Sequence, residues 1–524
     1  MNGLNNEQCE LDDLHEGQCD QDRCILIRAD ANTPMGTGHL MRCLALGQGR
    51  LDTGGQVVFV TACSNERLLQ RLEAENFIVH RIARTYPDVE DWQVTAHMLA
   101  EYPDAWVVLD GYHFDGEYQQ RVKESGHRLL VIDDMAHLPH YYADIVLNQN
   151  INAESLHYDC EPYTKLLLGT KYVLLRREFL EWEGRNRQIP DEASKVLVTL
   201  GGGDPENATL KVIQALEQLD ASGLEAKIVV GLANPNLEVL CQAVHHSTTN
   251  VQLLNAVTDM PELMAWADLA VSGGGSTSWE LAFMGVPGLI LILAENQRYI
   301  AEELDKIGVV LNLGWHEQVS SSQIAQVMGR LLLSAETRKR MATRGQDLVD
   351  GDGVDRVLMV VRGKRIRLRQ VCEKDARLVW EWANDPSVRT VSFSAEPIPW
   401  GQHLKWFQSK LKDPDYVFYI ALDGEDIPIG QIRYDLKDGE AIVSISLDSS
   451  FRGQGYGREI IELSSQKLFK VLDAKCIHSY VKMSNEVSVK MFLEAGFKKM
   501  GMEMNHGEIA VHLILSRKEN AWPA

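Results

Sequence analysis

The strongest constraint on the fold is the alternation of short apolar runs with helical patterns over roughly the first 350 residues. Apolar runs without polar alternation are typical of strands buried on both faces, as in parallel sheets with helices on each side. The predicted strands are 24–27, 56–60, 105–110, 128–133, 196–200, 226–231, 250–254 and 289–293, and the helices between them include 40–51, 65–76, 116–125 and 208–219. The sequence therefore predicts an α/β fold with two Rossmann-like domains.

Length, charge and cysteine use narrow the class of protein. At 524 residues the chain has room for about three domains. A net charge of −22 argues against nucleic acid or an anionic membrane as the main partner. The longest apolar candidate, 286–294, is strand-sized, and 1–22 is polar and is predicted to be a disordered acidic tail. Nine cysteines without metal-ligand spacing predict reduced thiols in the cytoplasm.

A glycine turn follows the first predicted strand, at Gly36-x-Gly38-His39. A strand that enters a helix through such a turn presents free backbone N–H groups and the positive end of the helix dipole to an anion. His39 is a candidate base near neutral pH, and Arg42, three residues later, shares its helix face. We expect Arg28 and Arg42 to add local positive charge. The alternative is that His39 is a cap or core residue.

Polar residues also end two other strands of the first domain. Asp110 and Tyr112 follow the strand at 105–110, and the pair 133–134 follows the next strand. In parallel sheets ligands collect at the carboxyl ends of strands, which makes Asp110 and Tyr112 candidates for substrate binding. The alternative is that Asp110 and Asp133 only form caps or turns.

Two further glycine turns follow strands of the second domain, at 201–203 and 273–275. We expect Gly203 and the amides from Gly274 through Ser276 to Thr277 to hold a diphosphate, and Glu280 to accept hydrogen bonds from a ribose diol. The alternative for Glu280 is a capping role. The segment 166–176 is predicted to cross between the domains, and 181–193 to contain the hinge.

These motifs carry a resemblance to known families. The pattern Gly-Gly-x-x-Thr-x-x-Glu ending at Glu280, followed by Gly285-Val286-Pro287, resembles the nucleotide-sugar site of GT-B proteins. The resemblance implies that Glu280 holds the ribose and that Asn296 and Gln297 lie near the sugar.

The N-terminal motif narrows this match. Arg28-x-Asp30, with Gly36-x-Gly38-His39-x-x-Arg42 and the stretch 168–179, resembles the UDP-sugar hydrolases of pseudaminic acid biosynthesis over about residues 24–350. Those enzymes remove UDP from UDP-2,4-diacetamido-2,4,6-trideoxy-β-L-altrose. The resemblance implies that His39 activates water, that Asp30 and Gly38 contribute to the substrate site, and that no metal is needed.

The pattern changes after about residue 350. The basic run 362–369 is predicted to be a domain boundary, and a helix at 376–384 carries Trp380 and Trp382. Strands at 416–421, 427–434 and 440–447 with Asp-Gly turns at 423–424 and 438–439 predict an antiparallel meander.

A third glycine turn follows this meander, at Arg452-Gly453-x-Gly455-Tyr456-Gly457, where free amides can wrap a pyrophosphate at a helix start. With Asn485, Ser488 and Phe492 it resembles the GNAT acetyltransferases. The resemblance implies acetyl-CoA as co-substrate, with the coenzyme bound by Ile445, Leu447, Arg452, Gly453, Gly455, Tyr456, Gly457, Asn485 and Ser488.

One residue departs from the GNAT pattern. Phe492 stands where many of these enzymes have a tyrosine that protonates the thiolate. Tyr456, Tyr480 or a water remain candidates for the acid, and His403, Glu425 or Asp448 for the base. The segment from Trp382 through Ser394 to Trp406 resembles the substrate-facing part of amino-sugar N-acetyltransferases, although Trp380 and Trp382 are also explained as core residues.

Together these patterns predict an acidic tail (1–22), an N-terminal Rossmann-like domain (23–178), a UDP-binding Rossmann-like domain (179–362) and a GNAT domain (363–524). The leading hypothesis is a bifunctional enzyme that N-acetylates a UDP-linked 4-amino sugar and hydrolyses the diacetamido altrose nucleotide to sugar and UDP. The alternatives are a UDP-sugar glycosyltransferase or epimerase fused to an unrelated acetyltransferase, and a non-catalytic nucleotide-sugar binding protein. Oligomeric state and channelling stay open.

Overall fold

A computed structural model describes most of the chain. The described residues are 24–31, 36–185, 187–202, 204–219, 223–231, 234–255, 257, 259–363, 365–424, 426–472, 474–505 and 507–517. The predicted tail 1–22, Gly203 and Glu425 lie outside them. The chain divides into two compact units, residues 1–358 and 359–524. Within the described residues no helix combines the length and the hydropathy that crossing a bilayer requires.

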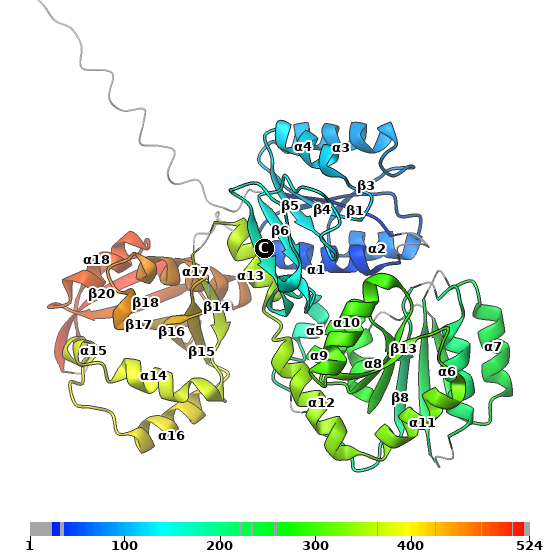
Figure 1. Cartoon of the computed structure of the whole chain (residues 1–524). Coiled ribbons are helices and arrows are strands. Elements are labelled where there is room, and N and C mark those ends of the chain that lie inside the picture. The colour runs from blue at the N-terminus through cyan, green and yellow to red at the C-terminus, as the bar shows by residue number, and fades with distance from the viewer. Residues whose placement is uncertain are drawn as a thin grey trace, which may run out of the picture. The chain divides into compact units, whose positions relative to one another are not determined.

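The first sheet has seven parallel strands in the order β3-β2-β1-β4-β5-β6-β7 (Figure 1). Its strands are β1 (Ile25–Ala29), β2 (Val57–Thr61), β3 (Ile78–Arg81), β4 (Trp106–Asp110), β5 (Arg128–Ile132), β6 (Ile145–Asn148) and β7 (Lys165–Leu168). Its helices are α1 (Gly38–Asp52), α2 (Glu66–Ala74), α3 (Val89–Glu101), α4 (Gly116–Glu124) and α5 (Arg177–Leu180), with short 3-10 turns η2 (Ala153–Ser155) and η3 (Thr170–Tyr172). Helices α1 and α2 lie on one side of the sheet and α3 and α4 on the other (Figure 1).

The predicted strands of this sheet are confirmed, and one prediction changes. The segment 166–176, expected to cross between domains, begins as the edge strand β7, which pairs with β6. The sequence analysis assigned no element to β3, α3 or β6. Strand β3 lacks a buried apolar run because it is a short edge strand whose four residues are partly exposed.

The second sheet has six parallel strands in the order β10-β9-β8-β11-β12-β13. Its strands are β8 (Lys195–Thr199), β9 (Glu225–Val230), β10 (Asn250–Asn255), β11 (Leu269–Gly273), β12 (Gly288–Ile292) and β13 (Val310–Trp315). Its helices are α6 (Ala208–Glu217), α7 (Leu237–His246), α8 (Met260–Trp266), α9 (Thr277–Phe283), α10 (Glu295–Lys306), α11 (Ser321–Leu332) and α12 (Ala335–Leu348).

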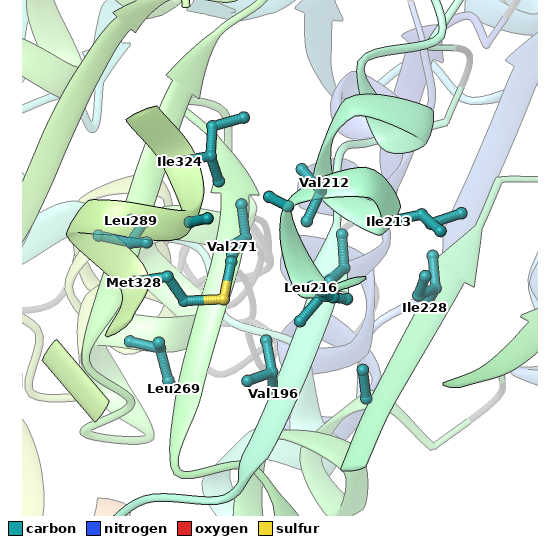
Figure 2. Packing of buried hydrophobic residues seen from close by; sticks show 14 of the residues in the cluster. Val196, Val212, Ile213, Leu216, Ile228, Leu269, Val271, Leu289, Ile324 and Met328 are labelled. Carbon is teal, nitrogen blue, oxygen red and sulfur yellow. The ribbon is translucent and has the colours of Figure 1, made fainter. Parts of the chain in front are cut away.

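Helices cover both faces of this sheet. On one face, Val212 of α6 and Met328 of α11 pack against Val196 and Val271 of the central strands (Figure 2). On the other face, Trp279 of α9 packs with residues of α8 and α10. This two-sided burial explains why the strands have continuous apolar sequences.

Both sheets share the strand order of a Rossmann fold, in which the direction of winding reverses between the first and fourth strands. The two reversal points are β1/β4 in the first sheet and β8/β11 in the second. Ligands of such sheets bind outside the carboxyl ends of these strands. A ligand site is therefore expected at the loops that follow β1, β4, β8 and β11.

Helix α13 (Gly353–Val361) packs against residues 171–173 of the first domain. Arg356 donates to the carbonyl oxygen of Lys171 at 2.7 Å. A Cβ on Gly353 would lie 2.1 Å from the carbonyl oxygen of Val173, so only glycine fits this approach.

The C-terminal unit has a seven-stranded mixed sheet in the order β14-β15-β16-β17-β18-β20-β19. Its strands are β14 (Arg367–Gln370), β15 (Tyr416–Leu422), β16 (Pro428–Lys437), β17 (Glu440–Leu447), β18 (Cys476–Lys482), β19 (Lys498–Asn505) and β20 (Glu508–Ser516). Its helices are α14 (Ala376–Ala383), α15 (Pro386–Val391), α16 (Trp400–Lys410), α17 (Tyr456–Val471) and α18 (Glu486–Glu494), with 3-10 turns η4 (Glu373–Asp375) and η5 (Ser449–Phe451).

The predicted meander is confirmed by the antiparallel pairing of β15, β16 and β17. Asp438 and Gly439, which connect β16 to β17, both have positive φ angles, of 54° and 81°. This is the backbone that an Asp-Gly hairpin turn favours.

We expect Gly353→Ala to lower the stability of the N-terminal unit by about 1–3 kcal/mol, because the new methyl group must displace backbone rather than a flexible side chain. The matched control is Gly329→Ala in α11, where the added Cβ would meet only the end of Leu219 at 3.2 Å. Thermal unfolding of both variants measures the difference. Equal unfolding temperatures for the two variants would show that α13 is not held this closely.

Candidate active sites

The first candidate site lies at the reversal point β1/β4. Helix α1 begins at Gly38 just after β1, and β4 ends at Asp110, which pairs in register with Ala29. Because β1 and β4 are neighbours, the His39 ring lies against Asp110, with 2.6 Å between Nδ1 of His39 and Oδ1 of Asp110. His39 is therefore buried against polar groups, and the edge of its ring also meets Tyr112 at a centroid distance of 4.9 Å.

The carboxylate of Asp110 determines which nitrogen of His39 carries the proton. Burial by itself raises the pKa of Asp110, but Arg42 and His39 hold that pKa well below its usual range. Ionised Asp110 accepts a hydrogen bond, so Nδ1 of His39 is the donor. The lone pair of a neutral His39 then lies on Nε2, which is the arrangement of a general base.

Arg42 binds two carboxylates of the same site. Its Nε and Nη2 each lie 2.7 Å from an oxygen of Asp110, and its Nη1 lies 2.8 Å from Oδ1 of Asp134. The other oxygen of Asp134 accepts a hydrogen bond of 2.7 Å from the Tyr112 hydroxyl. Burial and the neighbouring Asp134 raise the pKa of Tyr112, so it remains a donor.

Arg28 lies in a second buried ion cluster behind this site. It is fully buried, and its guanidinium is 2.5 Å from Asp30 and 2.5 Å from Asp91. Asp91, on α3, also accepts a hydrogen bond of 2.8 Å from the Tyr118 hydroxyl. Asp30 also accepts from the backbone N–H of Ala62 at 2.7 Å. This cluster therefore ties β1 to α3 and to the end of β2.

The ion pairs of Arg28 and Arg42 change which groups are expected to bind an anion. The sequence analysis expected Arg28 and Arg42 to attract an anion, but each guanidinium is already paired with two carboxylates. Buried ions of opposite charge neutralise each other because an unpaired one is too costly to bury. The charge of a bound diphosphate would then fall on backbone amides.

Residues of the second sheet meet this site at several points within the N-terminal unit. Asn296 at the start of α10 donates to the Tyr112 hydroxyl at 3.3 Å. A Cβ on Gly38 would lie 3.4 Å from Oγ of Ser276. Arg176 donates to Glu280 across a distance of 2.9 Å. The predicted residues of the two reversal points therefore face one another.

Glu280 and its neighbours line a small pocket of about 10 Å³. This volume has room for about one water molecule. Trp279 lines the same pocket, and its buried Nε1 has no hydrogen-bond partner among the described residues. Glu280 pairs with Arg176, which argues against the alternative of a helix cap. The ion pair uses Oε1 of Glu280.

The loop from Gly274 to Thr277 is held by the residue expected near the sugar. Oε1 of Gln297 accepts hydrogen bonds of 3.1 Å from the backbone N–H groups of Gly274 and Leu293. A Cβ on Gly274 would lie 2.9 Å from the carbonyl oxygen of Gln297. Gln297 thus fixes the glycine loop, and Thr277 is the first residue of α9.

The sequence analysis missed three members of this site. Asp134 binds Arg42, Arg176 binds Glu280, and Asp91 balances Arg28. Two of the three had a signal in the sequence. Asp134 follows a predicted strand, and Arg176 lies in the stretch 168–179. Asp91 lies in a helix that the analysis did not assign.

The second candidate site lies in the C-terminal unit, where β17 and β18 separate. Their parallel pairing runs from Glu440 and Cys476 to Ile442 and His478 and then stops, although both strands continue. The part of β17 that holds Ile445 and Leu447 therefore has no β18 partner on that side. Exposed backbone N–H and C=O groups of this kind are able to pair with an extended ligand.

Two polar side chains lie on the neighbouring strand pair. Gln431 of β16 and Ser446 of β17 are register partners, so their side chains share one face of the sheet. Oε1 of Gln431 and Oγ of Ser446 are buried and have no hydrogen-bond partner among the described residues. They are suited to accept hydrogen bonds from a bound amine.

The glycine turn that follows β17 has the expected backbone. Gly453 and Gly455 have φ angles of 75° and 85°, and Gly455 precedes the first residue of α17, Tyr456. A Cβ on Gly457 would lie 2.4 Å from Sδ of Met491. Arg452 donates twice to the carbonyl oxygen of Leu447, at 3.0 and 2.8 Å, which fixes the turn against the end of β17.

The remaining predicted residues of this unit have mixed placements. Asn485 caps α18 by accepting from the backbone N–H of Ser488 at 3.2 Å. Phe492 packs against Phe497 in the core. Tyr480 stacks on His512 at 4.7 Å. His403 is buried, and burial lowers its pKa; it lies among aromatic rings of α16, which does not favour it as a base.

Asp448 lines a pocket of about 370 Å³ with Trp380, Trp382, Asn384 and Asp385. This volume is within the range of small-molecule sites. Nε1 of Trp382 donates to Oδ2 of Asp448 at 2.9 Å. Both tryptophans thus line a cavity, and Trp382 also contributes to the core.

Comparison with known proteins identifies two domain families in the chain. Residues 196–355 match the glycosyltransferase family 28 C-terminal domain. Residues 365–498 match the acetyltransferase (GNAT) domain. The chain joins a GT-B-like pair of domains to a GNAT domain. The mixed sheet of the C-terminal unit, with its separated strands, is the sheet of this GNAT domain.

Curated relatives cover different lengths of the fusion. An uncharacterized protein of Methanocaldococcus jannaschii is 23% identical over 488 residues, 91% of this chain and 96% of the relative. The spore coat polysaccharide biosynthesis protein SpsG of Bacillus subtilis is 25% identical over 338 residues, 64% of this chain and 97% of the relative. The UDP-2,4-diacetamido-2,4,6-trideoxy-β-L-altropyranose hydrolase of Campylobacter jejuni is 22% identical over 289 residues, 54% of this chain and 97% of the relative.

We expect Asp91→Asn to destabilise the N-terminal unit by about 1–3 kcal/mol, because the amide accepts weaker hydrogen bonds from buried Arg28 and Tyr118 than the carboxylate does. Glu101→Gln, at the exposed end of the same helix, should change stability by less than about 0.5 kcal/mol. Urea unfolding followed by circular dichroism measures both. A small effect of Asp91→Asn would mean that Asp30 alone compensates the guanidinium.

Proposed function

We propose that the GT-B-like domains hydrolyse UDP-2,4-diacetamido-2,4,6-trideoxy-β-L-altrose to the free sugar and UDP. The observation that carries this proposal is the contact between His39 and ionised Asp110 at the reversal point of the first sheet. The similarity to the Campylobacter jejuni hydrolase supports the choice of substrate. The match to a glycosyltransferase C-terminal domain supports a nucleotide sugar as ligand.

The proposed reaction uses His39 as a general base. Nε2 removes a proton from a water molecule while the water oxygen bonds to the anomeric carbon of the sugar. The bond from that carbon to the diphosphate oxygen breaks, and its electron pair leaves with UDP. Asp110 stabilises the imidazolium that forms, and Arg42 keeps Asp110 ionised and in place.

Backbone amides carry the charge of the leaving group in this proposal. In the loop from Gly274 to Thr277, Gln297 already accepts from the N–H of Gly274, so we assign the diphosphate to the following N–H groups of the loop; Ser276 lies beside Gly38 at the start of α1. Because Arg28 and Arg42 are each paired with two carboxylates, backbone amides are the donors that we assign to the diphosphate. Glu280, whose Oε1 contacts Arg176, then accepts hydrogen bonds from the ribose hydroxyls.

We propose that the GNAT domain transfers an acetyl group from acetyl-CoA to the 4-amino group of the UDP-linked sugar that precedes the hydrolase substrate. The amine attacks the thioester carbon, and the C–S bond breaks with the electron pair going to the coenzyme thiolate. The separated end of β17 and the glycine turn support binding of the pantetheine arm and the pyrophosphate. The unpaired oxygens of Gln431 and Ser446 support an amine acceptor.

The two activities form one sequence in this proposal. Acetylation at the 4-amino group completes the diacetamido sugar that the hydrolase domains accept. Both substrates are small, water-soluble nucleotide derivatives, which supports a cytoplasmic location. A glycosyltransferase with the same nucleotide site would instead require an acceptor sugar, and UDP release in water alone separates the two functions.

We expect His39→Asn to lower UDP release from the altrose nucleotide by about 10²- to 10⁴-fold, because the variant has no base for the attacking water. Acetyl transfer should remain unchanged. A coupled assay for UDP in the absence of any acceptor measures the first activity, and a thiol reagent that detects free coenzyme A measures the second.

His97→Asn is the control, because His97 is an exposed histidine of α3. Hydrolysis by the His39 variant at the wild-type rate would refute the assigned base. A wild-type chain that releases UDP only when an acceptor sugar is added would replace the hydrolase with a glycosyltransferase.

For the acetyltransferase, we expect Gly455→Ala to raise KM for acetyl-CoA by at least about 10-fold. A side chain is strained at its φ of 85°, so the amides of the turn lose their alignment. UDP release should not change. Gly401→Ala in α16, where the added Cβ meets no atom within 4 Å, is the matched control. Equal KM values for the two variants would argue against this turn as the pyrophosphate site.

A further inference from the structure

A cluster of three ligand-type side chains lies where β17 and β18 are still paired. Nε2 of His478 is 3.1 Å from Sγ of Cys476 and 3.2 Å from Oε2 of Glu440. Donor atoms of the three residues all lie within 4.8 Å of one another. Glu440 and Cys476 are register partners, and Cys476 and His478 are two apart, so the three side chains share one face of the sheet.

A chain of ring contacts behind the cluster determines the tautomer of His478. Nδ1 of His512 lies 2.7 Å from Oε1 of Glu503, and Nε2 of His512 lies 2.9 Å from Nδ1 of His478. The carboxylate accepts, so Nδ1 of His512 is a donor and its Nε2 is an acceptor when the ring is neutral. His478 must then donate through Nδ1, which leaves its Nε2 with a lone pair.

That lone pair points toward two further electron donors. The Cys476 sulfur and the Glu440 carboxylate both approach the same nitrogen. A thiol proton satisfies only one contact with the nitrogen, and the carboxylate remains opposite a lone pair. A cation between the three atoms would satisfy all of them.

We propose that Glu440, Cys476 and His478 bind one zinc ion at the base of the separated strands. Zinc accepts mixed sulfur, nitrogen and oxygen ligands with bond lengths of about 2.0–2.3 Å. Tetrahedral angles then separate the ligand atoms by about 3.3–3.7 Å. The observed 3.1 and 3.2 Å require an opening of only a few tenths of an ångström. Binding replaces the proton of the Cys476 thiol with the metal and releases that proton to solvent.

The surroundings fit a metal site in two further respects. His512 and Glu503 form the kind of histidine–carboxylate outer contact that orients a metal-bound imidazole. Glu440 is exposed, which leaves the fourth coordination position of zinc to water. The ion would join β17 to β18 two residues before their pairing ends, and so would hold the base of the proposed coenzyme site.

Cobalt(II) is the probe, because it replaces zinc in such sites and a cobalt–thiolate bond gives a charge-transfer band in the near ultraviolet. We expect the full chain with one equivalent of Co²⁺ to show this band and added Zn²⁺ to remove it. Cys476→Ser should abolish the band, and Cys241→Ser, which changes an exposed cysteine of α7, should leave it intact.

Two further variants test whether these residues bind the metal or only support the fold. Glu440→Gln changes an exposed side chain and should weaken Co²⁺ binding while the far-ultraviolet circular dichroism stays unchanged. His512→Gln should keep the band and weaken binding by about 10- to 100-fold. No thiolate band in the wild-type chain, or a band that persists in Cys476→Ser, would overturn the proposal.

Discussion

The carboxylate of Asp110 is the group on which the first site depends. It sits fully buried at the end of β4 and is in contact with both His39 and Arg42 of α1. A buried carboxylate without partners would be far too costly to keep ionised, and removing Arg42 would leave its charge uncompensated. The helix start, the strand end and the imidazole are therefore fixed relative to each other by one requirement, that this charge be satisfied.

The need to compensate buried charge also explains the other buried ion pairs of this domain. Arg28 extends from β1 into the carboxylates of Asp30 and Asp91, and Arg42 reaches Asp134 after β5. Each arginine serves to position acids rather than to attract a ligand. The resulting site is not strongly positive, in agreement with the acidic chain, so in the proposed function amide dipoles would bind the diphosphate. Such dipoles are aligned before the ligand arrives, so their reorganisation costs little during catalysis.

The two candidate sites of the chain are built on different backbone arrangements. In the GT-B-like domains, reversal of the strand order opens two strand ends toward the same space. In the GNAT domain, β17 and β18 stop pairing at Ile442 and His478, and free backbone groups follow. Both arrangements leave backbone N–H or C=O groups without partners at places where a nucleotide or coenzyme could complete the hydrogen bonds. The Arg176 to Glu280 contact links the first domain to α9 of the second within this site.

The sequence by itself determined the class of fold and the main motifs. Continuous apolar strands, helical patterns and glycine turns are local signals, so the two parallel sheets, the meander and the turns at 36–38 and 453–457 were predictable. His39 and Asp110 were also visible as polar residues at strand ends. Their direct contact was not, since it depends on which strands become neighbours.

Tertiary structure alone decided the roles of the charged residues. Arg28 looks like an anion-binding residue in the sequence, yet pairing with Asp91, 63 positions away, makes it a structural cation. Glu440, Cys476 and His478 have no recognisable spacing because two strands supply them and meet only through the sheet register. Local sequence specifies which elements form, whereas charge pairing and strand neighbours arise from long-range packing, and these decide what each side chain is free to do.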